Sequence, residues 1–148
     1  MRVIFLDIDG VLNCWETTER WRGFIGIDPK LAQRLAELVR VTSAKVVLSS
    51  TWRCDPDWLK TMHANGVAGL IDRTPLLPNR ARGEEIDLWL HEHPEVERYA
   101  IIDDDSDMLD EQMSSYFRTS FFEDGLTEEI ARMVEQHFYA NSGARPTN

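Results

Sequence analysis

The chain has 148 residues, of which 43% are hydrophobic and 28% are charged, as expected for one folded domain with its own core. It contains no apolar run of the roughly 20 residues that a membrane-spanning helix needs. The formal net charge of −10 disfavours loose, sequence-independent binding to nucleic acid, but it does not exclude a nucleic-acid end as a substrate.

The first residues form a short apolar run that ends in charge (RVIFLDIDGVLN, residues 2–13). Val3 to Leu6 are continuously apolar, which predicts a strand covered on both faces. Asp7 and Asp9 follow this strand, and Gly10 then lets the chain turn away. Two carboxylates at this point either cap a turn or hold a group that needs two negative charges side by side.

The N-terminal stretch does not resemble a signal peptide, because two aspartates interrupt it and no small-residue cleavage site follows. We therefore predict an intracellular, cytoplasmic protein with no membrane partner and no obligate protein partner. Cys14 and Cys54 fit neither a disulfide framework nor a zinc site. Because each follows a predicted strand end, a regulatory disulfide between them is an alternative to two unrelated reduced thiols.

Residues 14–27 are polar and rich in aromatic residues and glycine, and we predict a loop or small flap there. Asp28 and Pro29 are typical of an N-cap and the first position of a helix, and leucines continue at helical spacing to about Val41. A second buried strand is predicted over residues 44–48 (AKVVL). It ends in a polar segment made of Ser49, Ser50, Thr51, Trp52 and Arg53.

The middle of the chain predicts a helix from Asp55 to Gly66 and a short strand over 69–71. A helix over 82–93 and a strand over 99–102 follow. The residues that we expect to face the core from these two helices are Trp58, Leu59, Met62, Ile86, Trp89 and Leu90. The second strand stops in Asp103, Asp104 and Asp105.

The last predicted elements are a strand over 117–122 and a helix over 127–139. The core stripe of this helix is Ile130, Met133, Val134 and Phe138. We assign residues 1–139 to a single catalytic domain and 140–148 to a disordered tail.

Strands that alternate with helices predict an α/β, Rossmann-like three-layer sandwich with a mostly parallel sheet. Ligands of such sheets bind beyond the carboxyl ends of the strands. Polar residues follow three of these ends, at Asp7, Ser49 and Asp103. Converging carboxylates repel one another unless a cation is bound, and hard oxygen ligands suit Mg²⁺. The sequence therefore predicts a magnesium site at this edge.

The motifs at these strand ends resemble those of the haloacid-dehalogenase-like (HAD) phosphohydrolase superfamily. Asp7-Ile8-Asp9-Gly10-Val11 is similar to its first motif, the strand ending in Ser49 to its second, and Ile101-Ile102-Asp103-Asp104 to its fourth. The third motif is a lysine or arginine near a helix start; Arg82 suits that place and Arg80 is the competitor. The resemblance implies a HAD-type fold and a Mg²⁺-dependent phosphatase.

The resemblance also implies a role for each site residue. Asp7 would attack phosphorus and form an aspartyl-phosphate, while Asp9 would protonate the leaving-group oxygen and then take a proton from water. Mg²⁺ would be held by the carboxylates of Asp7 and Asp104 and by the main-chain carbonyl of Asp9. Ser49 would hydrogen-bond a phosphoryl oxygen, and Arg82 would balance charge on the transferring group.

Supporting or substrate-binding roles are predicted for Gly10, Ser50, Arg53 and Asp103. Asp103 would stand beside the metal or the third-motif arginine, and Gly10 would leave room for the phosphate. Arg53 either binds the leaving part of the substrate or pairs with Asp55 or Asp57. Which of the three hydroxyls after the second strand binds phosphate stays open.

The short intervals between the motifs leave no room for an inserted lid, so the chain resembles a capless member with only the 14–27 flap over its site. An open site admits a phosphate on a large molecule. The strings LDIDGVLN, LSSTWR and IIDDD resemble the HAD domains of Swiss-army-knife RNA repair proteins and, more distantly, the 3′-phosphatase part of polynucleotide kinases. The predicted substrate is a nucleic-acid end or nucleotide, with phosphoproteins and small metabolites as alternatives. Trp15, Trp21 and Trp52 would either stack on a base or pack internally.

Two further interpretations come from other functional classes. A receiver-like module would carry its acidic pair and its phospho-accepting aspartate on different strands, followed by a lysine, but no lysine occurs after Lys60. A catalytically inactive phosphate- or Mg-binding domain is the other, and the intact Asp7, Asp9, Ser49 and Asp104 argue against it.

Overall fold

The computed structural model describes residues 1–140, whose main element is a five-stranded sheet in the order β5-β4-β1-β6-β7. Every strand pairing in this sheet is parallel. The strands are β1 (Arg2–Leu6), β4 (Lys45–Leu48), β5 (Leu70–Arg73), β6 (Arg98–Asp103) and β7 (Tyr116–Arg118). A separate antiparallel hairpin consists of β2 (Arg20–Trp21) and β3 (Phe24–Ile25).

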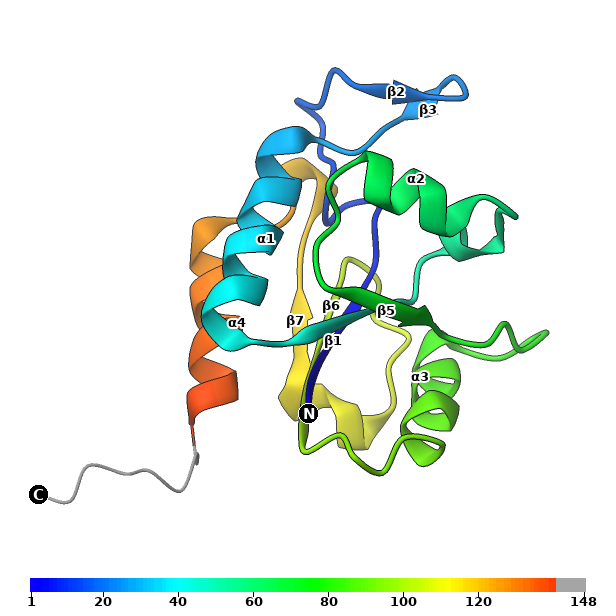
Figure 1. Ribbon diagram of the computed structural model, residues 1–148, viewed down its shortest axis with the longest axis vertical. Helices are drawn as coiled ribbons and strands as arrows, with labels where there is room; N and C mark the ends of the chain where they lie inside the picture. The colour runs from blue at the N-terminus through cyan, green and yellow to red at the C-terminus, as the bar shows by residue number, and fades with distance from the viewer. Residues whose placement is uncertain (141–148) are drawn as a thin grey trace, which may run out of the picture.

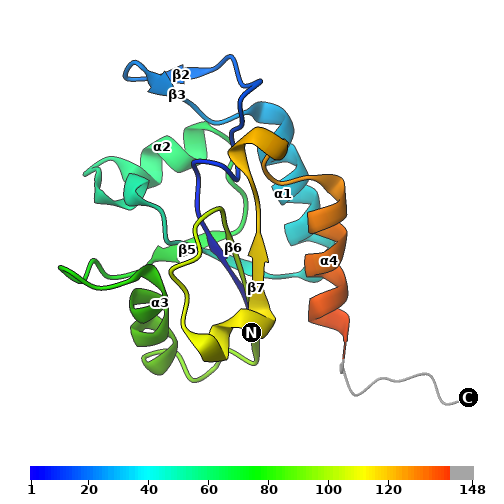
Figure 2. The same cartoon turned by 180° about the vertical axis from the view of Figure 1, so that it is seen from behind.

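The helices cover both faces of the sheet, as the sequence predicts. They are α1 (Pro29–Thr42), α2 (Trp58–Ala64), α3 (Arg82–His91) and α4 (Glu128–Tyr139). Three short 3-10 helices are η1 (Thr51–Cys54), η2 (Asp110–Ser115) and η3 (Phe121–Glu123). Helices α1 and α4 lie side by side on one face, and α3 covers the other (Figures 1 and 2).

Side chains of β1 alternate between the two resulting cores. Ile4 and Leu6 join the core beneath α1, α2 and α4, whereas Val3 and Phe5 join the one beneath α3. This alternation follows from the two-residue period of a strand, and it explains why the N-terminal apolar run is continuous. The α/β, Rossmann-like three-layer fold without a large cap is thereby confirmed.

The connectivity creates a crevice between β1 and β6. From β1 the chain passes to its neighbour β4 and on to β5, then returns across the sheet to β6 on the other side of β1. The two strands that flank the reversal leave a crevice beyond their carboxyl ends, where open α/β sheets bind ligands.

The flap predicted over 14–27 contains the β2–β3 hairpin, which lies beyond the carboxyl end of β1 (Figure 1). Its two turn residues, Arg22 and Gly23, both have positive φ, at 50° and 84°. Such a turn matches the twist of the flanking strands, and it places Trp21 opposite Phe24.

Some predicted boundaries are wrong. Helix α2 begins at Trp58 rather than Asp55, because the Asp55 side chain accepts a hydrogen bond from the Asp57 N–H (2.8 Å) and forms a turn before the helix. Two predicted core residues are also wrong, since the side chains of Leu59 and Met133 are 44% and 47% exposed.

The last strand is shorter than predicted. Strand β7 ends at Arg118, where its partner β6 ends at Asp103, and Phe122 beyond it lies in the 3-10 helix η3 and is 78% exposed. Of the tail predicted over 140–148, residues 141–148 lie outside the described part of the chain.

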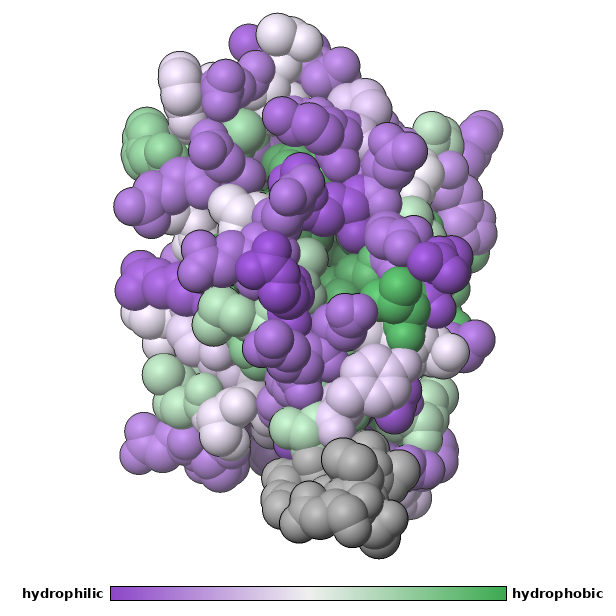
Figure 3. Space-filling view, turned by 90° about the vertical axis from the view of Figure 1, so that its left-hand side faces the viewer, coloured by the Kyte–Doolittle hydropathy of each residue, from purple (hydrophilic) through white to green (hydrophobic). Residues whose placement is uncertain are grey.

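The outer surface of α1 and α4 is mostly hydrophilic (Figure 3). Their apolar residues form an inner stripe on the sheet, with Leu31, Leu35 and Val134 fully or almost fully buried. Within residues 1–140, no helix is long and apolar enough to span a membrane.

Candidate active site

Three carboxylates meet at the crevice between β1 and β6. Asp7 follows the last residue of β1, and its N–H continues the pairing with β6 by donating to the carbonyl of Ile102 (3.1 Å). Asp103 is the last residue of β6, and Asp104 follows it. Each of Asp7, Asp103 and Asp104 offers an oxygen within 4.8 Å of the others. The sheet thus brings together residues almost a hundred positions apart.

Burying these three carboxylates next to one another is energetically unfavourable unless a cation is bound. Asp7 is only 5% exposed and Asp103 is fully buried. Burial, with the neighbouring charge of Asp103, raises the pKa of Asp7 to about 9, and burial also raises the pKa of Asp104. A hard cation with oxygen ligands would offset the repulsion, and the half-buried Asp104 leaves a side open. The donor set therefore fits Mg²⁺.

Contrary to the expectation from the sequence, the absence of a side chain at Gly10 does not leave room for the phosphate. Its φ is +79°, and an added Cβ would lie 2.3 Å from Oδ2 of Asp104. The space that the missing side chain leaves is therefore taken by Asp104 rather than by phosphate. The turn is held by the Gly10 N–H, which donates to Asn13 Oδ1 (2.8 Å), and by its carbonyl, which accepts from the Thr119 hydroxyl (2.6 Å).

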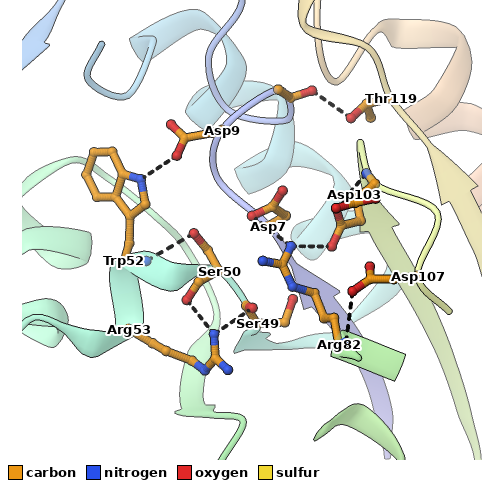
Figure 4. Close-up of polar contacts among 12 residues, drawn as sticks. Asp7, Asp9, Ser49, Ser50, Trp52, Arg53, Arg82, Asp103, Asp107 and Thr119 are labelled. Atoms are coloured by element: carbon orange, nitrogen blue, oxygen red, sulfur yellow. Dashed lines mark hydrogen bonds and ion pairs between the residues drawn. The ribbon is translucent and has the colours of Figure 1, made fainter. Parts of the chain in front are cut away.

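Arg82, at the start of α3, points into the acidic cluster (Figure 4). Its Nη1 lies 2.6 Å from Asp103 Oδ2 and 3.3 Å from Asp7 Oδ1. The helix start is fixed by Asp107, whose carboxylate accepts from the Arg82 N–H (3.0 Å). The side chain of Arg80 is 65% exposed and pairs with Glu84 at 3.5 Å. Of the two candidates, the structure places Arg82 at the carboxylates.

The hydroxyls after β4 differ in what they contact. The Ser49 N–H donates to the carbonyl of Leu6 (2.9 Å), which fixes Ser49 beside the end of β1. Its hydroxyl is buried and has no hydrogen-bond partner among residues 1–140. Ser50 Oγ accepts from the Trp52 N–H (3.2 Å) and caps η1, while Thr51 is exposed. Of the three residues, Ser49 is therefore the one whose buried hydroxyl can still form a hydrogen bond.

The predicted pairing of Arg53 is wrong. Its partner is neither Asp55 nor Asp57 but Glu85 on α3, at 2.9 Å, and both side chains are almost fully buried. Its Nη1 also donates to the carbonyls of Ser49 and Ser50, both at 2.9 Å. Arg53 therefore supports the end of β4, and its guanidinium is not free to bind substrate.

Asp9 stands apart from the acidic cluster. Its Oδ2 accepts from the indole N–H of Trp52 (3.1 Å), and its Oδ1 accepts from Asn13 Nδ2 (2.9 Å). Figure 4 shows its carboxylate turned toward Trp52 and away from Asp7. The metal ligand expected from Asp9 is its main-chain carbonyl, and that assignment stays a prediction.

The structure also shows the contacts of the three tryptophans and the two cysteines that were considered from the sequence. Trp21 and Trp52 stack on each other, with ring centroids 4.4 Å apart at 22°. The Trp15 indole N–H donates to Asp124 Oδ1 (3.2 Å). Both cysteines are free thiols, Cys14 buried and Cys54 exposed. Trp21 and Trp52 therefore pack on each other, whereas Trp15 stays 57% exposed, and the two thiols form no disulfide.

Sequence reasoning missed four residues that hold the site in place: Asn13, Glu85, Asp107 and Thr119. Asn13 had a local signal, since it lies four residues after Asp9 and directly follows a turn in which the N–H groups of Leu12 and Val11 donate to the carbonyl of Ile8 (2.8 and 3.0 Å). The others reach the site from distant segments, which no local pattern indicates.

Residues 3–131 match a family described as the HAD domain in Swiss Army Knife RNA repair proteins. No curated protein and no solved structure matched the chain. With the match over most of its length and the strand ends in the arrangement described above, the chain belongs to this family of HAD domains and so to the HAD-type phosphohydrolases in general.

Proposed function

We propose that the protein is a Mg²⁺-dependent phosphomonoester hydrolase that forms an aspartyl-phosphate on Asp7 and acts on a nucleic-acid end or a nucleotide. The observation that carries this proposal is the meeting of Asp7, Asp103 and Asp104 within 4.8 Å, with Arg82 bonded to the same group. Phosphoryl transfer depends chiefly on positioning and on neutralising charge, and these residues do both.

In the first step, an Asp7 carboxylate oxygen attacks phosphorus, and the bond from phosphorus to the leaving-group oxygen breaks. Asp9 gives its proton to that oxygen. Arg82 and the free hydroxyl of Ser49 offer donors to the phosphoryl oxygens. Asp7, Asp104 and the main-chain carbonyl of Asp9 would hold Mg²⁺, which would supply positive charge beside the phosphoryl oxygens.

In the second step, Asp9 takes a proton from water, and the water oxygen attacks the phosphorus of the aspartyl-phosphate. The bond between phosphorus and Asp7 then breaks and inorganic phosphate leaves, which restores the free carboxylate. The same side chain thus acts as acid and then as base. Its hydrogen bonds to Trp52 and Asn13 hold it in one place for both steps.

The nucleophile is tested with a generic aryl phosphate and Mg²⁺. Asp7→Asn keeps the shape of the side chain but removes the attacking charge, and we expect kcat to fall by at least about 10⁴-fold. Asp110→Asn, at an exposed position of η2, is the matched control and should retain wild-type turnover. Turnover that persists in Asp7→Asn, with contamination excluded, would contradict the assignment. An inactive wild type with intact Mg²⁺ binding would favour a binding module instead.

The substrate class needs a panel of 3′- and 5′-phosphorylated oligonucleotides, mononucleotides, phosphopeptides and sugar phosphates, compared by kcat/KM. We expect the nucleotides and oligonucleotide ends to lead. A wide margin for phosphopeptides or sugar phosphates would support the alternative phosphoprotein or small-metabolite phosphatase.

A further inference from the structure

A cavity of about 440 Å³ lies between the β2–β3 hairpin and η1, within the range of about 300–1,000 Å³ that is usual for small-molecule sites. Its walls are mainly aromatic, with a few polar groups at the rim. The residues that matter for its chemistry are Asp9, Trp21, Phe24, Trp52, Asp55 and Phe121.

Asp9 connects this cavity to the reaction. Its carboxylate is one of the polar groups on the wall, and the Trp52 indole and the Asn13 amide fix it from two sides. A general acid must lie within hydrogen-bond reach of the oxygen that it protonates. The part of the substrate bonded to that oxygen therefore lies in this cavity, on the opposite side of Asp9 from the acidic cluster.

The hairpin presents one free aromatic ring to the cavity. Trp21 and Phe24 face each other across the hairpin, so their side chains lie on the same face. Trp21 is already covered, by Trp52 on one side and by the Arg22 guanidinium 4.5 Å from its centroid. Phe24 is 72% exposed and has its ring available. A flat ring can stack there without displacing a protein side chain.

The charges at the rim select against a second anionic group. Among residues 1–140, two carboxylates and no lysine or arginine line the cavity. The nearby Arg22 is paired with Asp55. Carboxylate, hydroxyl and amide oxygens at the rim can accept hydrogen bonds from N–H and O–H groups. The occupant is therefore neutral, flat, aromatic and edged with donors.

We propose that this cavity is the leaving-group subsite and that it takes the terminal nucleoside of the substrate, with its base against Phe24. This inference rests on the proposed phosphatase function. A nucleoside supplies both the flat ring and the donors, and it uses more of the cavity than the bare phenyl ring of a phosphotyrosine would. When the bond from phosphorus to oxygen breaks, the nucleoside takes the Asp9 proton and leaves as the free alcohol.

The test measures nucleoside binding directly, because binding needs no turnover. Wild-type protein is titrated calorimetrically with adenosine and cytidine, and with ribose and phenol as comparison ligands. We expect the nucleosides to bind and to inhibit aryl-phosphate hydrolysis competitively, and ribose and phenol to do so far more weakly.

Two phenylalanine variants locate the binding. Phe24→Ala should weaken nucleoside binding and raise the KM for nucleoside monophosphates by about tenfold, as expected for loss of one stacking contact. Phe122→Ala is the matched control, since it removes a similarly exposed ring (78%) that does not line the cavity. It should leave both values unchanged.

Four results would overturn the inference. One is equal nucleoside binding by the two variants, and another is a tenfold rise in KM for phosphotyrosine peptides, but not nucleotides, in Phe24→Ala. If aryl phosphate is hydrolysed but nucleosides do not bind, the leaving-group inference fails while the proposed function stands. If nucleosides bind but no Asp7-dependent turnover exists, the proposed function fails, and the cavity is not a leaving-group site.

Discussion

The carboxyl edge of the sheet has two sides with different chemistry. The acidic side, defined by Asp7, Asp103, Asp104 and Arg82, is built on the ends of β1 and β6 and the start of α3. The aromatic side, defined by Asp9, Trp21, Phe24 and Trp52, is built on the turn after β1, the hairpin and η1. Both sides contain carboxylates, yet these carboxylates have opposite surroundings.

On the acidic side, buried like charges outnumber the single arginine, and the pKa of Asp7 rises to about 9. On the aromatic side, Asp9 is exposed and satisfied by two hydrogen bonds from neutral donors. The acidic side suits the binding of a cation and a phosphoryl group. The aromatic side suits the transfer of a proton to a neutral leaving group. Adjacent carboxylates can thus differ in function because of what surrounds them.

After the loss of the Asp7 nucleophile, the largest expected effect is also on the acidic side. Arg82→Ala should lower kcat by about 10²–10³-fold for every substrate, because it removes donors to the transferring group. It also leaves Asp7 and Asp103 without their cationic partner. Arg80→Ala, two residues earlier and exposed, is the matched control and should change kcat less than about twofold. The reverse order of the two variants would show that the third-motif residue is Arg80.

On the aromatic side, the effect should depend on the leaving group. Asp9→Asn should lower kcat/KM by about 10²–10³-fold for an alkyl phosphate but much less for an aryl phosphate with an acidic phenol, which needs no proton. The second step should still be slow, so the aryl phosphate should give a burst of phenol in stopped-flow measurements. An equal loss for both substrates, without a burst, would place the general acid elsewhere.

The smallest expected effect is on the stability of the protein. It tests the difference between the acidic side and the aromatic side without any substrate. In EDTA, the folded protein binds a proton at Asp7 more tightly than the unfolded chain does, because its pKa is raised to about 9. Stability should therefore fall as the pH rises from about 5 to 9, by at least ~1 kcal/mol or about 2–4 °C in Tm.

Mg²⁺ should raise Tm more at the upper end of this range than at the lower end, because it binds the ionised carboxylates. Asp7→Asn should flatten the slope seen in EDTA, whereas Asp110→Asn, the exposed control, should keep it. A metal-free protein with the same Tm at pH 5 and pH 8.5 would show that the cluster is not under electrostatic strain.

The motif residues could be predicted from the sequence, because each is the first polar residue after a buried strand, and parallel strands end at one edge. Asp7, Ser49 and Asp103 follow this rule. Arg53 shows its limit: its charge suggested a nearby aspartate, but the fold placed Glu85 of α3 against it. A partner that depends on helix packing has no fixed sequence spacing, so local reasoning chose the wrong carboxylate.

The sequence by itself therefore determined the parallel α/β fold, the three strand ends and the absence of a large lid, because hydrophobic periodicity and chain length limit these features. Only the tertiary structure decided that Asp104 occupies the space at Gly10, that Arg82 rather than Arg80 meets Asp7, and that Asp9 faces an aromatic cavity. These outcomes depend on distances of a few ångströms between segments far apart in the chain. Packing sets those distances, and no run of neighbouring residues encodes them.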